Sequence, residues 1–333
     1  MRLLRVVALT AATAAVVVAT TAAIPGSQAD PPPRLPALTP AALSARYAAD
    51  ARAVARAATD AARAGDTRQA HALAAMRGRR FLFFDPNGQG EAGEVLGNLA
   101  TARRVAVLVP GSDTSLATFD SRGSASPGGG ARALAAEGRR LQPGARLAVI
   151  AWLGYATPAT LSPGVLTSGD ARQGARVLTT LVDRLAARGD QVALLCHSYG
   201  TVVCGLAAPG LPVTDIAVYG SPGVDASSVR SLHTAGRVWA GRAAADWIRD
   251  VPHVRLLGLG FGQDPVAPAF GARIFACGSG GHSGYLRPGS VALRNLAAIA
   301  LGDPAVSARR AFQLCCGSRP ASSGSAGTGR AGG

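Results

Sequence analysis

Short apolar segments alternate with amphipathic ones from residue 80 onward, and this alternation constrains the fold of the 333-residue chain most strongly. The apolar runs are continuous, which is typical of strands buried on both faces of a mainly parallel sheet. The segments between them have apolar residues at helical spacing, so helices should cover both faces. The sequence therefore predicts an α/β fold. The expected strands are Arg80–Phe84, Arg104–Val109, Ala145–Trp152, Gln191–Leu195, Thr214–Tyr219, Val254–Leu259 and Arg273–Ala276, and the expected helices are Ala131–Arg140, Ser168–Arg188, Tyr199–Ala207 and Ser290–Ala300.

The N-terminus has the pattern of a secretory signal peptide. Arg2 and Arg5 precede the apolar run 6–24, and the small-x-small sequence Ser27-Gln28-Ala29 follows it. This pattern predicts a signal peptide over residues 1–29 and a secreted or cell-envelope protein. The run is also long enough for an uncleaved membrane anchor, but its weak Ala/Thr hydrophobicity favours cleavage.

A linker and a helical segment are expected between the signal peptide and the α/β domain. Residues 30–79 start with a Pro-rich stretch and continue as an Ala/Arg-rich region with predicted helices over Pro40–Ala64 and Asp66–Arg77. These helices can pack on the domain, form a wall-associated stalk or act as a cap, and the sequence leaves the three options open. The α/β domain should span residues 80–314, and residues 315–333 form a Gly/Ser-rich tail expected to be disordered.

The net charge of +15 comes from Arg alone, because the chain contains no Lys. The Arg residues are scattered singly or in pairs, without a basic block or interleaved aromatic residues. This distribution argues against a nucleic-acid partner. Long-range attraction to an anionic cell-envelope surface fits the charge better. We expect a monomer.

Five cysteines are present, and two of them bracket a predicted strand–helix turn. Cys196 and Cys204 should lie at similar depth in the strand and the helix, so they form either a disulfide or two buried thiols. Cys277 with Cys315 or Cys316 is the other candidate pair. Neither Cys-x-x-Cys nor His-rich spacing occurs, so we expect no metal site, and no residue pattern calls for a cofactor.

Ser198 lies in the turn between the expected strand and helix, in the sequence Cys196-His197-Ser198-Tyr199-Gly200. Such a turn lifts a serine hydroxyl clear of the sheet and aims the amides of the following helix at a developing oxyanion. The usual pattern is Gly-x-Ser-x-Gly, and Cys196 replaces its first Gly. We therefore predict that Ser198 is a nucleophile. The amide of Tyr199 and one from Gly111 or Ser112, after an earlier strand, are the predicted oxyanion donors.

A serine nucleophile requires a base and a carboxylate that orients it, which in this fold follow in the order Ser, acid, His. Of the histidines after Ser198, His282 lies in a Gly-rich loop that can reach the serine. Asp264 comes just after the expected strand Val254–Leu259, whereas Asp246 precedes that strand and should lie at its wrong end. The predicted triad is Ser198, Asp264 and His282.

Several short blocks resemble those of an actinobacterial α/β-hydrolase family defined as a domain of unknown function. The resemblance covers residues 81–301, and many relatives have Gly where this chain has Cys196. It implies an α/β-hydrolase fold and the triad Ser198, Asp264 and His282, and it implies no substrate. The blocks are Val109–Gly111, Ala151–Tyr155, Cys196–Gly200, Gly220–Gly223, Asp264–Val266 and Gly281–Tyr285.

These features together predict an exported serine hydrolase that acts on a small-molecule or lipid ester without a cofactor. A peptidase or an acyltransferase can use the same machinery. A catalytically silent, wall-associated binding protein that uses the N-terminal helices is the alternative from a different class.

Overall fold

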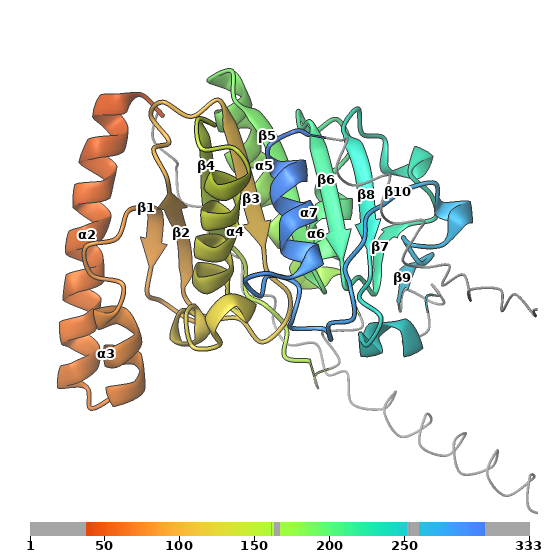
Figure 1. Ribbon diagram of the computed structural model, residues 1–333. Helices are drawn as coiled ribbons and strands as arrows, with labels where there is room; N and C mark the ends of the chain where they lie inside the picture. Colours follow the sequence, from red (N-terminus) through yellow and green to blue (C-terminus); the bar gives the residue numbers. More distant parts are fainter. Residues whose placement is uncertain (1–37, 161, 163–166, 252, 254–259, 304–333) are drawn as a thin grey trace, which may run out of the picture. The chain divides into compact units, whose positions relative to one another are not determined.

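The computed structural model describes residues 38–160, 162, 167–251, 253 and 260–303. The described helices and strands belong to one compact unit (Figure 1). The helices are α2 (Pro40–Arg63), α3 (Thr67–Ala74), α4 (Pro127–Leu141), α5 (Gly169–Ala187), α6 (Gly200–Ala207) and α7 (Val291–Ala300). The strands are β1 (Phe81–Asp85), β2 (Glu91–Leu96), β3 (Arg104–Val109), β4 (Leu147–Leu153), β5 (Gln191–His197), β6 (Asp215–Tyr219), β7 (Gly223–Ala226), β8 (Arg237–Gly241), β9 (Phe261–Gly262) and β10 (Arg273–Ile274).

An eight-stranded sheet with the order β1-β2-β4-β3-β5-β6-β8-β10 forms the centre of the fold. Neighbouring strands pair in parallel along the series β4-β3-β5-β6-β8-β10. Strands β2 and β1 add antiparallel pairs at one edge. The register joins Val109 to Cys196 and His197 to Tyr219, so these parallel strands end at one edge of the sheet. The loops that follow these strands, including the one with Ser198, therefore meet at this edge. β7 and β9 form a separate two-stranded parallel sheet.

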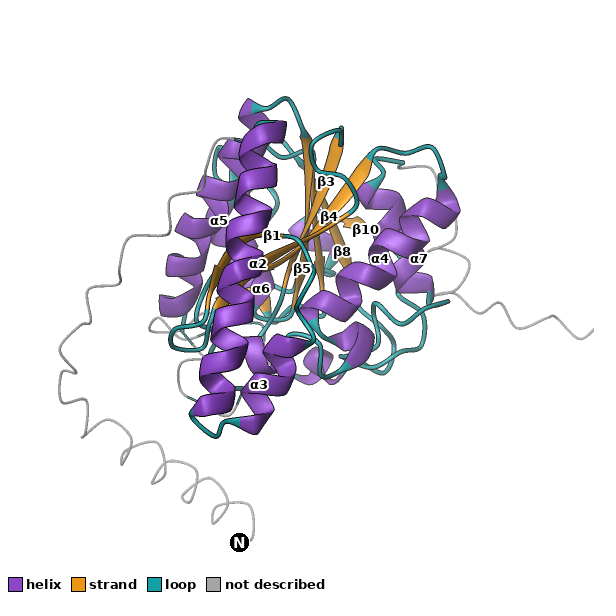
Figure 2. Cartoon of the chain, turned by 90° about the vertical axis from the view of Figure 1, so that its left-hand side faces the viewer, coloured by secondary structure: helices purple, strands orange, loops and turns teal. Residues whose placement is uncertain are grey.

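Helices cover both faces of the sheet, as the continuous apolar runs predict. α5 and α6 lie on one face, and α4 and α7 lie on the other (Figure 2). Successive residues of β3 point to opposite faces, so Val107 packs in one buried cluster and Leu108 in the other. This arrangement confirms the predicted α/β-hydrolase-like sheet.

The N-terminal helices pack on the domain, which is one of the three options left open by the sequence. α2 and α3 lie beside β1 at the edge of the sheet (Figure 1). Leu43 and Val54 of α2 are buried in the two clusters on opposite faces, and Arg46 Nε donates a hydrogen bond to the carbonyl oxygen of Leu82 at 2.8 Å. The predicted signal peptide and Gly/Ser-rich tail lie outside the described residues.

The strand assignment differs from the sequence prediction at two places that matter for the site. β2 and β8 were not predicted, because each is short and contains glycine, which weakens the apolar signal. β8 lies between β6 and β10 in the sheet. The predicted strand Val254–Leu259 falls outside the described residues.

Asp50 of α2 is a buried acid whose charge is unfavourable in the fold. Its side chain faces Arg46, with 3.1 Å between Oδ2 and Nε. Burial raises the pKa of Asp50 from 3.8 to about 6, although the positive charge of Arg46 acts in the opposite direction. Because the folded-state pKa lies above the unfolded-state value, the unfolded chain loses this proton first as the pH rises. The contribution of Asp50 to stability therefore falls between about pH 4 and pH 6.

Replacing Asp50 by Asn should raise stability at neutral pH and have less effect in acid. The free energy of unfolding of D50N minus that of wild type, measured with urea, should be about 2 kcal/mol larger at pH 7.5 than at pH 4. The reason is that only the carboxyl group bears the cost of ionisation. The exposed Asp60 on the same helix supplies the control D60N, which should change stability little because this side chain lies in solvent. An equal D50N effect at both pH values would contradict the prediction.

Candidate active site

Ser198 occupies a strained turn at the carboxyl edge of the sheet. β5 ends at His197 and α6 begins at Gly200, so a two-residue connection turns the chain from strand to helix. Ser198 has a φ of 52°, in the left-handed region that non-glycine residues seldom adopt. Its amide donates to the carbonyl oxygen of Tyr219 at 3.1 Å, which holds the turn against β6. This is the geometry of a nucleophile turn.

Two glycines let the loop after β3 approach Ser198 closely. A Cβ on Gly200 would lie 2.4 Å from the carbonyl oxygen of Pro110. A Cβ on Gly111 would lie 2.6 Å from the Cβ of Ser198 and 3.1 Å from its Oγ. Because no side chain fits at either position, the backbone of Gly111 lies directly beside the serine. The structure thus brings the expected oxyanion segment to the predicted nucleophile, Ser198.

His282 links Ser198 to a carboxylate. Its Nε2 lies 3.0 Å from Ser198 Oγ, and its Nδ1 lies 2.8 Å from Oδ1 of Asp246. The carboxylate accepts a hydrogen bond from Nδ1–H, which leaves Nε2 of the neutral ring to accept the serine proton. Ser198 and His282 are therefore neighbours, as the sequence order predicts.

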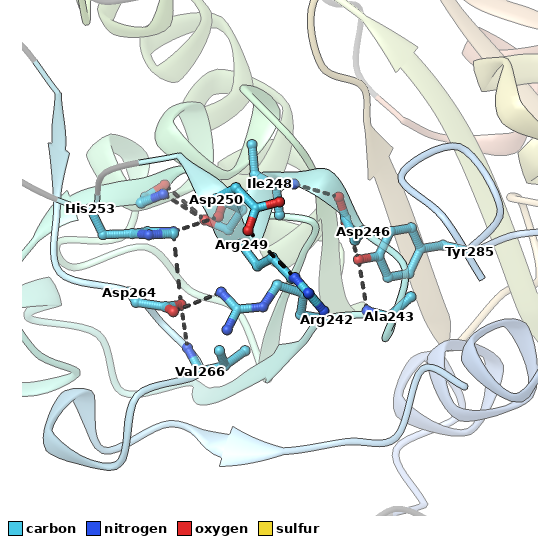
Figure 3. A network of polar contacts seen from close by, with 12 residues as sticks. Arg242, Ala243, Asp246, Ile248, Arg249, Asp250, His253, Asp264, Val266 and Tyr285 are labelled. Carbon is cyan, nitrogen blue, oxygen red and sulfur yellow. Dashed lines mark hydrogen bonds and ion pairs between the residues drawn. The ribbon is translucent and has the colours of Figure 1, made fainter. Parts of the chain in front are cut away.

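Asp246 is fully buried and held by three donors. Besides His282, the amide of Ile248 donates to Oδ1 at 2.9 Å and the hydroxyl of Tyr285 donates to Oδ2 at 2.5 Å (Figure 3). Burial by itself would raise the pKa of Asp246, but the hydrogen bonds from His282, Tyr285 and the Ile248 amide outweigh it and lower the pKa. The carboxylate is therefore ionised where a histidine base needs an anionic partner.

The prediction that Asp264 orients His282 is wrong. Asp264 forms an ion pair with Arg242, with 2.7 Å between Oδ2 and Nη1, and its Oδ1 lies 3.9 Å from His253 Nε2 (Figure 3). The error follows from the unpredicted strand β8, which ends at Gly241. Asp246 thus comes just after a strand of the sheet and lies at the edge that holds Ser198.

Two rings flank the imidazole of His282. The rings of His197 and Trp247 each have their centroid 4.7 Å from that of His282. His197 Nε2 lies 2.9 Å from the carbonyl oxygen of His282, to which it donates a hydrogen bond. Burial lowers the pKa of His197 to about 3, so this ring is neutral at neutral pH. The sequence does not identify His197, Trp247 and Tyr285 as site residues, although His197 precedes Ser198 directly, Trp247 follows Asp246 directly and Tyr285 comes three residues after His282.

A cavity of about 780 Å³ opens onto Ser198, within the usual size range of small-molecule sites. Gly111, Ser112 and Tyr199, the predicted oxyanion residues, all line it. Among the described residues, no group of three or more His, Cys, Asp or Glu side chains is placed to hold a metal ion. The expectation that no cofactor is required stays a prediction.

Cys196 and Cys204 form a disulfide, with 6.5 Å between their Cα atoms. It joins the end of strand β5 to helix α6, so its two cysteines lie on either side of Ser198 in the sequence. Both cysteines are fully buried. The alternative of two free thiols is therefore not realised. Cys277 is a buried thiol, and its candidate partners Cys315 and Cys316 lie outside the described residues. None of the described helices is long and apolar enough to cross a membrane.

Comparison with known sequences gives a family match that includes Ser198 and Asp246. Residues 85–256, more than half of the chain, match the family described as "Alpha/beta hydrolase". The chain is 34% identical over 262 residues to the uncharacterized protein Rv2079 of Mycobacterium tuberculosis, covering 67% of this chain and 39% of that protein. It is 40% identical over 91 residues to the uncharacterized protein Rv0963c of the same species, covering 26% and 34%. The chain thus spans about two fifths of the length of the first of these relatives.

Solved structures show more distant likenesses. A dienelactone hydrolase from Anabaena variabilis is 14% identical with a TM-score of 0.42, over 67% of this chain and 96% of that chain. A serine hydrolase without lid from Xanthomonas campestris is also 14% identical with a TM-score of 0.42, over 67% and 94%. At this level of similarity, neither likeness carries a functional argument.

Removal of the disulfide should destabilise the fold around Ser198. Replacing both Cys196 and Cys204 by Ala is expected to lower the free energy of unfolding by about 2–3 kcal/mol, because a short closed loop is released in the unfolded chain. Both cysteines lie in one tryptic peptide, residues 189–230. Its mass, measured without reduction, should increase by two hydrogen atoms after reduction. Alkylation of Cys196 and Cys204 in the unreduced, denatured protein would contradict the bond.

Proposed function

The chain belongs to the alpha/beta hydrolase family, and on that basis we propose that it is a serine hydrolase acting on carboxylic esters through Ser198, His282 and Asp246. One observation carries the proposal: the hydrogen-bonded series from Ser198 Oγ through His282 to the buried carboxylate of Asp246. A serine hydroxyl at a strained turn, a neutral imidazole and an oriented carboxylate are the parts that acyl transfer requires.

The reaction follows from the positions of these groups. Ser198 Oγ attacks the ester carbonyl carbon while its proton moves to His282 Nε2, and Asp246 stabilises the resulting imidazolium. Amides of Tyr199 and of Gly111 or Ser112 are proposed to hold the oxyanion. His282 then gives the proton to the departing alcohol. Water attacks the acyl-serine while His282 accepts its proton, and His282 returns that proton to Ser198 Oγ as the acyl–oxygen bond breaks and the acid leaves.

We also propose that the enzyme acts outside the cytoplasm. The Cys196–Cys204 disulfide is compatible with an oxidising compartment, and the pattern of residues 1–29 is typical of a signal peptide. Contact with an anionic envelope surface remains part of this proposal, motivated by the charge of +15.

A fluorophosphonate probe tests the nucleophile directly. The folded full-length protein should be labelled on Ser198, and S198A should not be labelled, because the probe reacts only with an activated serine. S227A, which replaces an exposed serine, is the matched control and should label like wild type. Failure of folded wild type to react would favour the silent binding protein. A panel of p-nitrophenyl esters and peptides separates an esterase from a peptidase, and acyl transfer to added alcohols identifies an acyltransferase.

Two aspartate variants test which acid serves His282. D246N should lower kcat for p-nitrophenyl acetate by about three orders of magnitude, since the amide no longer holds the reactive tautomer of the base. D264N removes the same charge from a residue that contacts Arg242 instead, so its kcat should stay close to that of wild type. A larger loss of kcat in D264N than in D246N would show that Asp264, and not Asp246, is the acid that orients His282.

A further inference from the structure

The strand order divides the cavity into two halves on opposite sides of Ser198. Ser198 directly follows β5. In the sheet, β3 and β4 lie to one side of β5, while β6 and β8 lie to the other. Loops that follow β3 and β4 therefore line one half of the cavity, and loops that follow β6 and β8 line the other, while the loop after β10 adds His282, Ser283, Tyr285 and Leu286 to the wall. The acyl group and the alcohol group of an ester extend in different directions from the carbonyl carbon that Ser198 would attack.

The half beyond β6 is apolar. Every described residue that the loops after β6 and β8, together with β9, contribute to the cavity wall has an apolar side chain or none. Trp247 dominates this wall, because it is half exposed and its ring lies against that of His282. An exposed indole beside the reacting groups is a contact surface for an apolar ligand group. The residues of this apolar half are Pro222, Trp247, Ile248, Val251, Gly260 and Phe261.

The half beyond β3 carries hydrogen-bonding side chains. Asp113 accepts from the amide of Thr160 at 3.0 Å and from its hydroxyl at 2.5 Å, which fixes the loops after β3 and β4 to one another. Arg122 is exposed and lines the cavity, so its guanidinium can reach a ligand there. With one cationic and one anionic side chain, this half suits a neutral group with several hydroxyls better than a charged group. Its polar residues are Ser112, Asp113, Thr114, Arg122, Ser124, Ser126 and Thr160.

We propose that the substrate is an amphipathic ester with an apolar group bound over Trp247 and a neutral, hydroxyl-bearing group bound beside Asp113 and Arg122. This inference rests on the proposed function of Ser198. Glycerol or sugar esters of medium-chain acids have the required chemistry. Size supports the assignment as well, since a cavity of about 780 Å³ holds such a molecule.

Four esters test the division of the cavity with the full-length protein. Glycerol monooctanoate and octyl glycerate carry both kinds of group in opposite orders, methyl octanoate carries only the apolar group, and glycerol monoacetate carries only the polar one. At least one of the first two should have a kcat/KM about tenfold above that of each half-substrate, because each matched group adds binding energy.

Ratios between esters assign each half to its residues. For the preferred amphipathic ester, W247A should lower the ratio of its kcat/KM over that of glycerol monoacetate about tenfold, since the octyl group loses its aromatic contact. The ratio is the correct readout because Trp247 also contacts His282. Removing the indole therefore changes kcat/KM for every ester, and a ratio cancels that common change. R122Q should lower the ratio of kcat/KM for the same amphipathic ester over methyl octanoate. I274A and R139Q, which replace exposed residues outside the cavity, are the matched controls and should change neither ratio.

The possible results separate this inference from the function on which it rests. Ser198-dependent hydrolysis without a preference for either amphipathic ester, or ratios unchanged by both W247A and R122Q, would overturn the amphipathic substrate and leave the hydrolase in place. Absence of Ser198-dependent hydrolysis of all four esters would overturn the proposed function and this inference together.

Discussion

The left-handed turn at Ser198 is the constraint on which the remaining site geometry depends. A φ of 52° at a serine is unfavourable and persists only where the surroundings hold it. Here β6 binds the amide of Ser198, the backbone of the loop after β3 packs against it without an intervening side chain, and the Cys196–Cys204 bond ties β5 to α6. These contacts with the sheet thus hold the strained backbone of Ser198 and keep its hydroxyl at the sheet edge.

His282 is held as firmly as the serine, although it lies in a loop. Asp246 binds one ring nitrogen, His197 binds the backbone carbonyl, and Trp247 packs on the ring. Tyr285 comes from the same loop as His282 and binds the other oxygen of Asp246. His282 and Asp246 therefore position one another, and in the proposed mechanism this reduces the reorganisation required during proton transfer.

The residues recognisable from sequence were those whose signal is local. Ser198 stands between an apolar strand and a helix, and His282 lies in a Gly-rich loop after the last expected strand. Asp246 was missed because β8, with only five residues and a terminal glycine, has a weak pattern, so the sequence does not show that Asp246 follows a strand of the sheet. The disulfide needed the actual distance between β5 and α6. The contrast between the cavity halves depends on strand order, which residue spacing does not specify.

The hydrogen bond between His282 Nδ1 and Asp246 is the central feature of the proposed mechanism, and proton NMR can observe it in the resting protein. With ¹⁵N-labelled histidine, wild type should show a low-field proton resonance on Nδ1 of His282, as expected for an imidazole N–H bound to a buried carboxylate. That resonance should persist in D264N and disappear in D246N. Its persistence in D246N, or its loss in D264N, would contradict the assignment of Asp246 as the partner of the base.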